Sequence, residues 1–326
     1  KQTSGGSMKI VEDYRGCYPD GVERYWNLQQ FSNDNNTVLF HGMGCIEDPR
    51  YKQKYENYEK KAFINLEHPC AWQSSKTTRD LSSNIDRYFD KIFTICPYSA
   101  EWLNDIQSDD VYIPHYIPFE KQHVVDKKEE KIFDAIYWGG IHSEENFKIV
   151  DSIKDFKYNF LSLGPQHWAG HFRNSPAKKM ITSYSVPRKV MWSLLRQTKV
   201  CPMSNLLFLQ EPQIRNIKSM HHWDKCDAFS NLDKFIMPQN KTRMIECAVN
   251  RTLILVKRNP WKLDEMWFTP DEDFIYFDDY SELPSIIDHI SKNWHNYEQI
   301  VENAFAKATT KYTVENFINQ ITEEIR

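Results

Sequence analysis

Short apolar runs alternate along the chain with longer stretches in which apolar residues recur every three or four positions. In the first third of the chain, this pattern predicts strands at 8–14, 37–40, 62–66, 91–95 and 111–113, and helices at 22–31, 51–61, 81–89 and 99–106. Strands that alternate with helices form βαβ units, so we expect a parallel sheet. Ligands of such sheets bind beyond the carboxyl ends of the strands.

A charged segment with few apolar residues, KQHVVDKKEEK at 121–131, interrupts this alternation and predicts an interdomain linker. A second series follows, with strands predicted at 133–138, 158–163, 200–203, 252–256 and 274–277, and helices at 144–153, 187–197, 241–249 and 281–290. Ser281 is the expected N-cap of the last of these helices. Two more helical patterns, at 294–309 and 314–325, end the chain.

Two domains are expected from this organisation and from the length of 326 residues. We place an N-terminal α/β domain at 8–125 and a C-terminal α/β domain at 132–293. The final helices, at 294–326, are expected to pack back towards the first domain. Residues 1–7, KQTSGGS, have the composition of an expression-tag remnant and are left out of the fold prediction.

The charge, the apolar runs and the cysteines of the chain argue against several classes of protein. The net charge is −4 and the chain has no Lys/Arg stripe, which argues against a nucleic-acid partner. The longest apolar runs, such as Thr252 to Val256, are too short to cross a bilayer, so no transmembrane segment is expected. The 7 cysteines are scattered without C-x-x-C spacing. They predict neither a disulfide framework nor a zinc site, and they favour a reducing, cytoplasmic location.

One ordered stretch of about forty positions resembles a known family. It contains Arg243, Glu246, Ala248, the apolar run 252–256, Glu265 before Trp267–Phe268, the turn 270–272 and Glu282–Leu283. In this order the residues resemble the donor-binding segment of GT-B glycosyltransferases, specifically the group similar to the CgeB spore-maturation protein. The strand and glycine pair at 134–140 resemble the start of that family's second domain. The resemblance covers most of the chain and is strongest after Phe133.

The resemblance implies an α/β fold of two Rossmann-like domains that face each other across a cleft. It also implies transfer of a hexosyl or pentosyl group from a nucleotide-diphosphate-sugar donor to a glycan, a protein or a small molecule, without a cofactor. Two positions depart from the family pattern. Asn250 replaces a glycine, and we expect it to adopt the left-handed backbone that the turn needs. Pro238 replaces the first acidic residue of retaining relatives, so a retaining mechanism does not carry over.

The expected donor site combines five residues. A carboxylate accepts two hydrogen bonds from a ribose diol, and the resemblance gives this role to Glu246. Gly139 and Gly140 follow a strand and allow backbone N–H groups to approach phosphate. Lys241 and Arg243 open a helix, where cations are unfavourable unless they face an anion, so we assign them to the diphosphate.

The catalytic base is expected at a strand end of the first domain, where His41 and Glu67 follow apolar runs. The alternative is that these residues only satisfy loop backbone. No metal is expected, because the acidic turn 271–273 follows Pro270 between strands and is interpreted as a solvated turn. His171 or the Arg188–Lys189 pair could add phosphate contacts.

Two other functions stay open from the sequence: a nucleotide-sugar epimerase on the same fold, and a non-catalytic protein that binds a nucleotide or sugar.

Overall fold

The computed structural model describes the greater part of the second half of the chain and portions of the first. These are residues 9–12, 37–41, 58, 60–65, 89–98, 100, 101, 104, 111–116, 118, 119, 121, 124–164, 170–208, 215 and 236–325. The chain divides into two compact units. Unit 1 comprises 1–120, 209–239 and 313–326, and unit 2 comprises 121–208 and 240–312. The charged segment 121–131 therefore belongs to unit 2, and the last change of unit falls between Tyr312 and Thr313.

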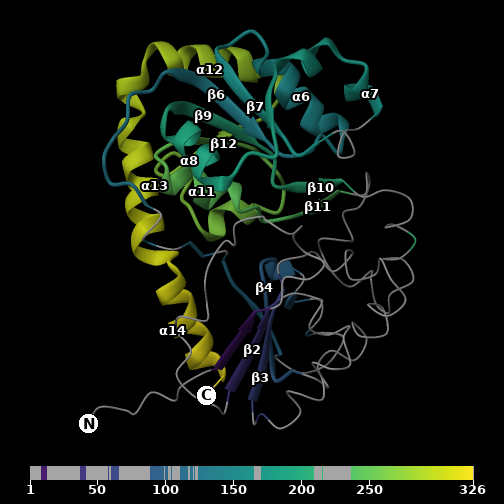
Figure 1. The fold of residues 1–326 in the computed structure, drawn as a ribbon, viewed down its shortest axis with the longest axis vertical. Helices are drawn as coiled ribbons and strands as arrows, with labels where there is room; N and C mark the ends of the chain where they lie inside the picture. The colour runs from purple at the N-terminus through teal and green to yellow at the C-terminus, as the bar shows by residue number, and fades with distance from the viewer. Residues whose placement is uncertain are drawn as a thin grey trace. The chain divides into compact units, whose positions relative to one another are not determined.

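Unit 1 contains a parallel sheet whose strands follow the order β1-β2-β3-β4-β5 (Figure 1). The strands are β1 (Lys9–Glu12), β2 (Thr37–His41), β3 (Lys60–Asn65), β4 (Lys91–Thr94) and β5 (Tyr112–Pro114). Helix α14 (Val314–Ile325) packs on β3. Its Phe317 lies with its ring centroid 5.0 Å from that of the buried His115. The last helix of the chain thus completes the core of the unit that contains the first strands.

Unit 2 contains a six-stranded parallel sheet with the order β13-β12-β9-β6-β7-β8. The strands are β6 (Phe133–Trp138), β7 (Tyr158–Ser162), β8 (Ile181–Tyr184), β9 (Thr198–Met203), β12 (Leu253–Lys257) and β13 (Ile275–Phe277). Counted from β6 as the first strand, this is the 3-2-1-4-5-6 order of doubly wound nucleotide-binding folds. From β6 the chain adds strands outward on one side, to β7 and β8, and then returns to add β9, β12 and β13 on the other side. Ligands of such folds bind at this switch point between β6 and β9.

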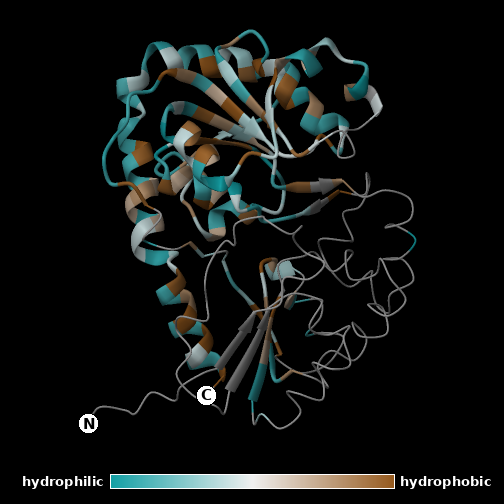
Figure 2. Ribbon diagram, viewed as in Figure 1, coloured by the Kyte–Doolittle hydropathy of each residue, from teal (hydrophilic) through white to brown (hydrophobic). Residues whose placement is uncertain are grey.

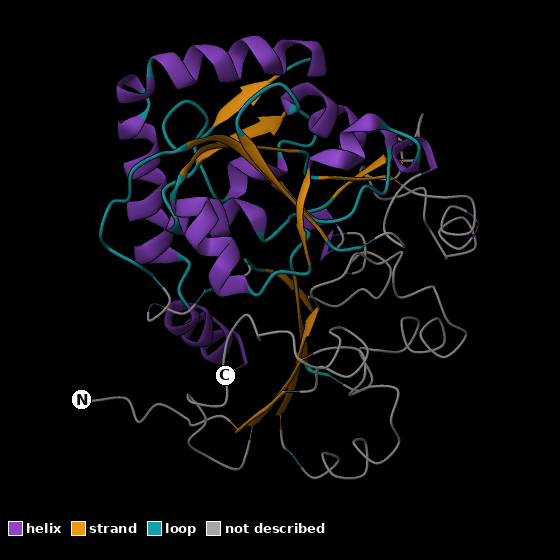
Figure 3. Ribbon diagram, turned by 45° about the horizontal axis from the view of Figure 1, so that its top comes forward, coloured by secondary structure: helices purple, strands orange, loops and turns teal. Residues whose placement is uncertain are grey.

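Helices cover both faces of this sheet, as Figure 3 shows. On one face, α6 (Glu144–Ile153) and α12 (Leu283–Lys292) pack against each other. The other face is covered by α8 (Arg188–Arg196), α11 (Arg243–Val249) and α13 (Glu298–Lys311). Figure 2 shows hydrophobic residues concentrated in the central strands, where Ile136, Val200 and Ile254 are fully buried. A strand covered on both faces is apolar where it is buried, and the charged residues Asp134 of β6 and Lys199 of β9 lie near the amino ends of their strands and pair with each other.

Shorter elements complete the described chain. They are α7 (Gly170–Arg173), β10 (Leu206–Phe208), β11 (Ile236–Pro238) and the 3₁₀ helices η5 (Pro176–Met180), η7 (Leu263–Met266), η8 (Tyr280–Glu282) and η9 (Trp294–Asn296).

The expected α/β fold with parallel sheets is confirmed, but two local predictions are wrong. Ser281 is not the N-cap, because Asp279 caps η8 and forms a reciprocal capping box with Glu282. Asn250 has φ −108°, and the left-handed residue of that turn is Arg251 at φ 54°. The Asn250 amide instead donates to the carbonyl oxygen of Glu246 at 2.8 Å, which fixes Asn250 as the C-cap of α11.

Candidate functional site

The glycine pair, Gly139 and Gly140, follows β6 at its carboxyl end. Strand β6 lies beside β9, where the strand order of unit 2 reverses (Figure 1). Gly139 has φ 114°, a conformation that residues with a side chain rarely adopt. Its N–H donates to the carbonyl oxygen of Leu161 at 2.9 Å, which continues the bonding to β7 by one residue. The local sequence therefore needs glycine for the turn itself.

Arg243, the first residue of α11, lies against this turn. Its guanidinium carbon is 4.9 Å from the ring centroid of Tyr137 and 5.4 Å from that of Trp138. A Cβ atom added to Gly139 would lie 2.1 Å from Nη2 of Arg243. The structure thus brings together two residues that the sequence analysis assigned to the donor. The stacking on Tyr137 and Trp138 was missed, although both aromatic residues directly precede the glycine pair.

Glu246 lies in the middle of α11 and is only 4% exposed. Neither of its carboxylate oxygens accepts a well-formed hydrogen bond from a described residue, and the Nε atom of Arg188 lies 3.8 Å from Oε1. Burial raises the pKa of the Glu246 carboxyl, and the Arg188 guanidinium and the Trp192 indole partly oppose that rise. A buried carboxylate with unused lone pairs is costly unless donors reach it. Vicinal hydroxyls are donors of the right kind.

Arg188 and Trp192 stand four residues apart on α8, so both lie on one face of the helix. That face is directed at Glu246, since both side chains influence its carboxyl. From the sequence, Arg188 was expected only as a phosphate contact, and no role was predicted for Trp192. The four-residue spacing was the available signal, but nothing in the sequence indicated that α8 and α11 are neighbours.

Lys241 does not present a free ammonium group. Its Nζ donates to the carbonyl oxygens of Ser204 at 2.6 Å and Leu206 at 3.2 Å, and burial lowers its pKa to about 7. Lys241 thus fastens the loop after β9 to the start of α11. A second buried group, the carboxylate of Asp264, also holds these loops. It accepts hydrogen bonds from the side-chain amides of Asn205 and Asn259. These contacts fix the loops at the carboxyl ends of β9 and β12.

The two candidate bases belong to unit 1. His41 is the last residue of β2, and its backbone pairs in register with Ile64 of β3. That places it at the carboxyl end of its strand, as expected. The structure says nothing of the His41 side chain, and Glu67 and the side chain of His171 lie outside the described residues.

The acidic turn at 271–273 is only partly as expected. Asp273 is buried rather than solvated: its carboxylate accepts from the backbone N–H of Thr269 at 2.8 Å and pairs with Lys307 of α13. Its role in the described structure is to hold the turn. Within the described ranges, no group of three His, Cys, Asp or Glu side chains is placed to hold a metal ion.

Comparison with known proteins identifies the family. The sequence model of a family described as glycosyl transferase-like matches residues 148–323, which is more than half of the chain. The chain therefore belongs to the glycosyl transferase-like family, as the resemblance in its sequence implied. None of the curated proteins is similar enough in sequence to be counted as a relative.

Several solved structures share the fold at very low sequence identity. TarM of S. aureus superposes with a TM-score of 0.56 and 8% identity over 89% of this chain and 54% of TarM. HepE of Anabaena, solved with UDP and glucose, gives 0.57 and 8% over 88% of this chain and 77% of HepE. Sucrose-phosphate synthase of Thermosynechococcus elongatus gives 0.60 and 8% over 88% and 72%. The chain thus spans about half the length of TarM. These similarities confirm the GT-B fold.

In the described part of the chain, no helix is both long and apolar enough to cross a membrane.

Proposed function

We propose that this protein binds a nucleotide-diphosphate sugar in unit 2 and transfers the sugar to a glycan or other acceptor. The observation that carries the proposal is the Glu246 carboxylate, which is buried, accepts no well-formed hydrogen bond from the described part of the chain and lies beside Arg188. It belongs to a helix whose first residue contacts the glycine turn of β6. Family membership and the switch-point position of the turn support the same assignment.

The parts of the donor are assigned by chemistry. The ribose diol donates to Glu246 and so satisfies lone pairs for which the described residues supply no well-formed donor. The diphosphate lies against Gly139 and Gly140, where the guanidinium of Arg243 is already held by Tyr137 and Trp138. Lys241 supports this site indirectly, through the loop after β9. Among donors, a uridine nucleotide is the first to test, because HepE was solved with UDP and glucose.

The direct test is calorimetric titration of the whole chain with UDP, GDP, ADP and their sugar conjugates. We expect one nucleotide to bind, and Glu246→Ala to weaken it by about 1.5–3 kcal/mol, the value of hydrogen bonds to a charged group. Asp288→Ala, which removes an exposed carboxylate from α12, is the matched control and should leave affinity unchanged. Equal affinities of the wild type and Glu246→Ala would remove Glu246 from the donor site.

Transfer is proposed to need a general base from unit 1, with His41 and Glu67 as candidates, and no metal ion. The phosphate charge would be met by Arg243 and by backbone N–H groups. Activity should therefore survive EDTA. Loss of activity with EDTA and its return with manganese or magnesium would contradict this part of the proposal.

A cytoplasmic location is proposed from the thiols. Cys201 of β9 and Cys247 of α11 are buried, unoxidised and within hydrogen-bonding reach of each other. Two adjacent thiols persist in a reducing compartment, whereas an oxidising one favours disulfides. Mass spectrometry of the alkylated, unreduced protein from its native cell should find both thiols free. A Cys201–Cys247 disulfide would contradict this location.

A further inference from the structure

Positive charge is unevenly distributed along unit 2. Between Asp155 and Glu211 the chain has 8 Lys and Arg residues and no Asp or Glu, although the whole chain has a net charge of −4. These cations are dispersed in the sequence and form no run, but the lack of acidic residues leaves the segment with a strong positive excess. Opposite charges must come from other parts of the chain or from a partner.

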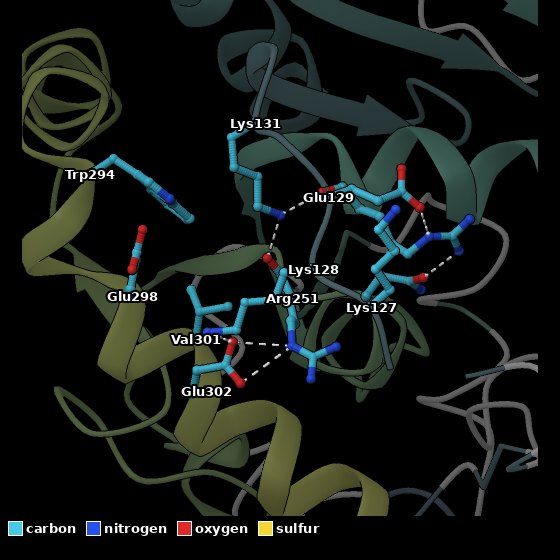
Figure 4. Close-up of a pocket in the computed structure, with 11 residues that line it drawn as sticks. Lys127, Lys128, Glu129, Lys131, Arg251, Trp294, Glu298, Val301 and Glu302 are labelled. Carbon is cyan, nitrogen blue, oxygen red and sulfur yellow. Dashed lines mark hydrogen bonds and ion pairs between the residues drawn. The ribbon is translucent and has the colours of Figure 1, made fainter. Parts of the chain in front are cut away.

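One group of cations acts inside the fold. Arg196 pairs with Glu129, and together with Lys131 and Arg251 it lines the cavity shown in Figure 4. The Nζ atom of Lys131 donates to the carbonyl oxygens of Arg196 at 2.7 Å and Arg251 at 2.6 Å, where helices α8 and α11 end. Cations stabilise the carboxyl ends of helices. These charges are thus accounted for within unit 2.

Four other cations of the segment are exposed near strand β8, and we call them the basic edge. They are Arg173 of α7, Lys178 and Lys179 of η5, and Lys189 in the first turn of α8. Helix α7 packs on η5, which leads directly into β8. Among the described strands, β8 pairs with β7 alone and so ends the sheet. Figure 1 places α7 on the side of unit 2 away from α13.

Exposed apolar side chains lie among these cations. Of the seven large hydrophobic residues that the described chain exposes, four are here: Leu163 at 49%, Met180 at 41%, Tyr184 at 51% and Val190 at 46%. Met180 and Val190 each directly follow a lysine. Ser185, next to Tyr184, donates to the carbonyl oxygen of Leu163 at 3.4 Å, so these two apolar residues lie at the same end of β8. Lysines discourage an edge strand from pairing, but that role needs no apolar groups in water.

Exposed cations mixed with exposed apolar groups fit a membrane whose surface is anionic. Anionic headgroups attract Lys and Arg, and each such residue strengthens binding about fivefold. Apolar and aromatic side chains enter the boundary between headgroups and acyl chains. A soluble polyanion would satisfy the cations alone. Charge interactions decay within about 8 Å at physiological ionic strength, so the local excess counts for more than the net charge of −4.

We propose that the basic edge docks this protein on an anionic membrane surface as a peripheral contact. Its cations contact the lipid headgroups, and the four apolar side chains enter the boundary beneath them. The proposal does not depend on the donor assignment, because none of these residues belongs to the proposed donor site. A protein held in this way meets acceptors at a membrane more often than acceptors in solution.

Flotation of the whole chain with phosphatidylcholine vesicles, with and without one quarter of phosphatidylglycerol, tests the proposal. We expect binding to the anionic vesicles that added salt weakens, and none to the neutral vesicles. Lys178→Glu with Lys179→Glu should weaken binding about 25-fold or more, since each cation contributes about fivefold. Lys127→Glu with Lys128→Glu is the matched control. It reverses another exposed lysine pair, one flanked by acidic residues, and should bind as the wild type does.

A second variant isolates the apolar contribution. Tyr184→Ser with Val190→Ser keeps every charge and should weaken vesicle binding about fivefold or more, because it removes apolar surface that the membrane would bury. Its affinity for heparin, a soluble polyanion, should equal that of the wild type. All the substituted positions are exposed, and circular dichroism checks that each variant is folded.

Four results would overturn the proposal. The first is no binding to the anionic vesicles. The second is an equal loss in the two lysine-pair variants, which would assign the attraction to net charge. The third is full vesicle binding by Tyr184→Ser with Val190→Ser, which would make the partner a soluble polyanion. The fourth is a dimer in sedimentation velocity that Lys178→Glu with Lys179→Glu abolishes, which would assign the basic edge to a second copy of the chain.

Discussion

At the scale of single residues, the burial of the Glu246 carboxylate affects both the stability of the free protein and the proposed binding of the donor. A buried carboxylate without hydrogen-bond donors destabilises the folded protein, and proteins keep such groups where function needs them. Among the described residues, none donates a well-formed hydrogen bond to Glu246, and the nearest cation, Arg188, is 3.8 Å away. The pair is too long for a hydrogen bond. The site is thus prepared for a ligand at some expense in stability.

Glu246→Gln should therefore stabilise the free protein by about 1–3 kcal/mol at neutral pH, the cost of an unsatisfied buried group. The folded-state pKa of this carboxyl is above the ordinary 4.5, so the folded protein retains a proton that the unfolded chain loses. Its contribution to stability is present at low pH and falls as pH rises from 4.5 to the raised pKa. Urea unfolding at pH 4 to 8 should show a flatter profile for Glu246→Gln. An unchanged profile would mean that Glu246 is solvated.

Gly139→Ala should disrupt the site by a local steric effect. The added Cβ would lie 2.1 Å from Nη2 of Arg243, and the backbone has φ 114°. We expect a loss of about 1–3 kcal/mol in stability, as for a residue forced into a sparse backbone region, together with weaker nucleotide binding as Arg243 moves. Gly170→Ala is the control, because no atom lies within 4 Å of its Cβ position. Thermal unfolding that shifts equally in both variants would contradict the prediction.

At the scale of elements, the sequence predicted the later part of the chain closely. The bounds of β6, α6 and α14 agree with the expected ranges, because each is a long periodic run with clear breaks. Strand β8 was missed: Ile181–Tyr184 is short and polar and lies at the sheet edge, so it has little hydrophobic signal. The pairing of α8 with α11 at Glu246 was also beyond the sequence, since it depends on the strand order.

Arg251 joins three elements at the end of α11. Its guanidinium pairs with Glu302 of α13, donates to the carbonyl oxygen of Val125 at 3.2 Å and pairs with Asp126. It also lies 3.4 Å from the ring centroid of Phe305. These contacts hold a non-glycine residue at φ 54° and attach the charged segment to unit 2.

Arg251→Ala should destabilise unit 2 by about 2–4 kcal/mol. It leaves the partly buried Glu302 with fewer partners, and it removes the side-chain contacts that hold the left-handed backbone at this position. Arg258→Ala is the matched control. Arg258 also combines an ion pair, with Asp278, and a ring contact, with Tyr276, but its side chain is 52% exposed. It should lose no more than about 1 kcal/mol. Chemical denaturation of both variants checks the difference, and equal losses would show that Arg251 is not a structural centre.

For the whole molecule, the important feature is the distribution of candidate groups between two units. The donor candidates Gly139, Arg243 and Glu246 belong to unit 2, and the candidate base His41 belongs to unit 1. The chain passes between the units several times, and its last helix returns to the first strands. Binding and chemistry should therefore respond to different substitutions.

His41→Ala is the sharpest test of this separation. A group that acts mainly in the transition state changes turnover and not ground-state binding. We expect kcat to fall by about 10²–10⁴-fold, the usual contribution of a general base, while the calorimetric Kd for the donor stays within twofold. Thr37→Ala, at the opposite end of strand β2, controls for damage to the sheet and should retain full turnover. Glu246→Ala should show the reverse pattern, with weaker donor binding.

If His41→Ala keeps full turnover, the base must be sought elsewhere, with Glu67 as the next candidate. If it weakens donor binding as much as turnover, His41 contributes to the donor site and the division of roles between the units is wrong.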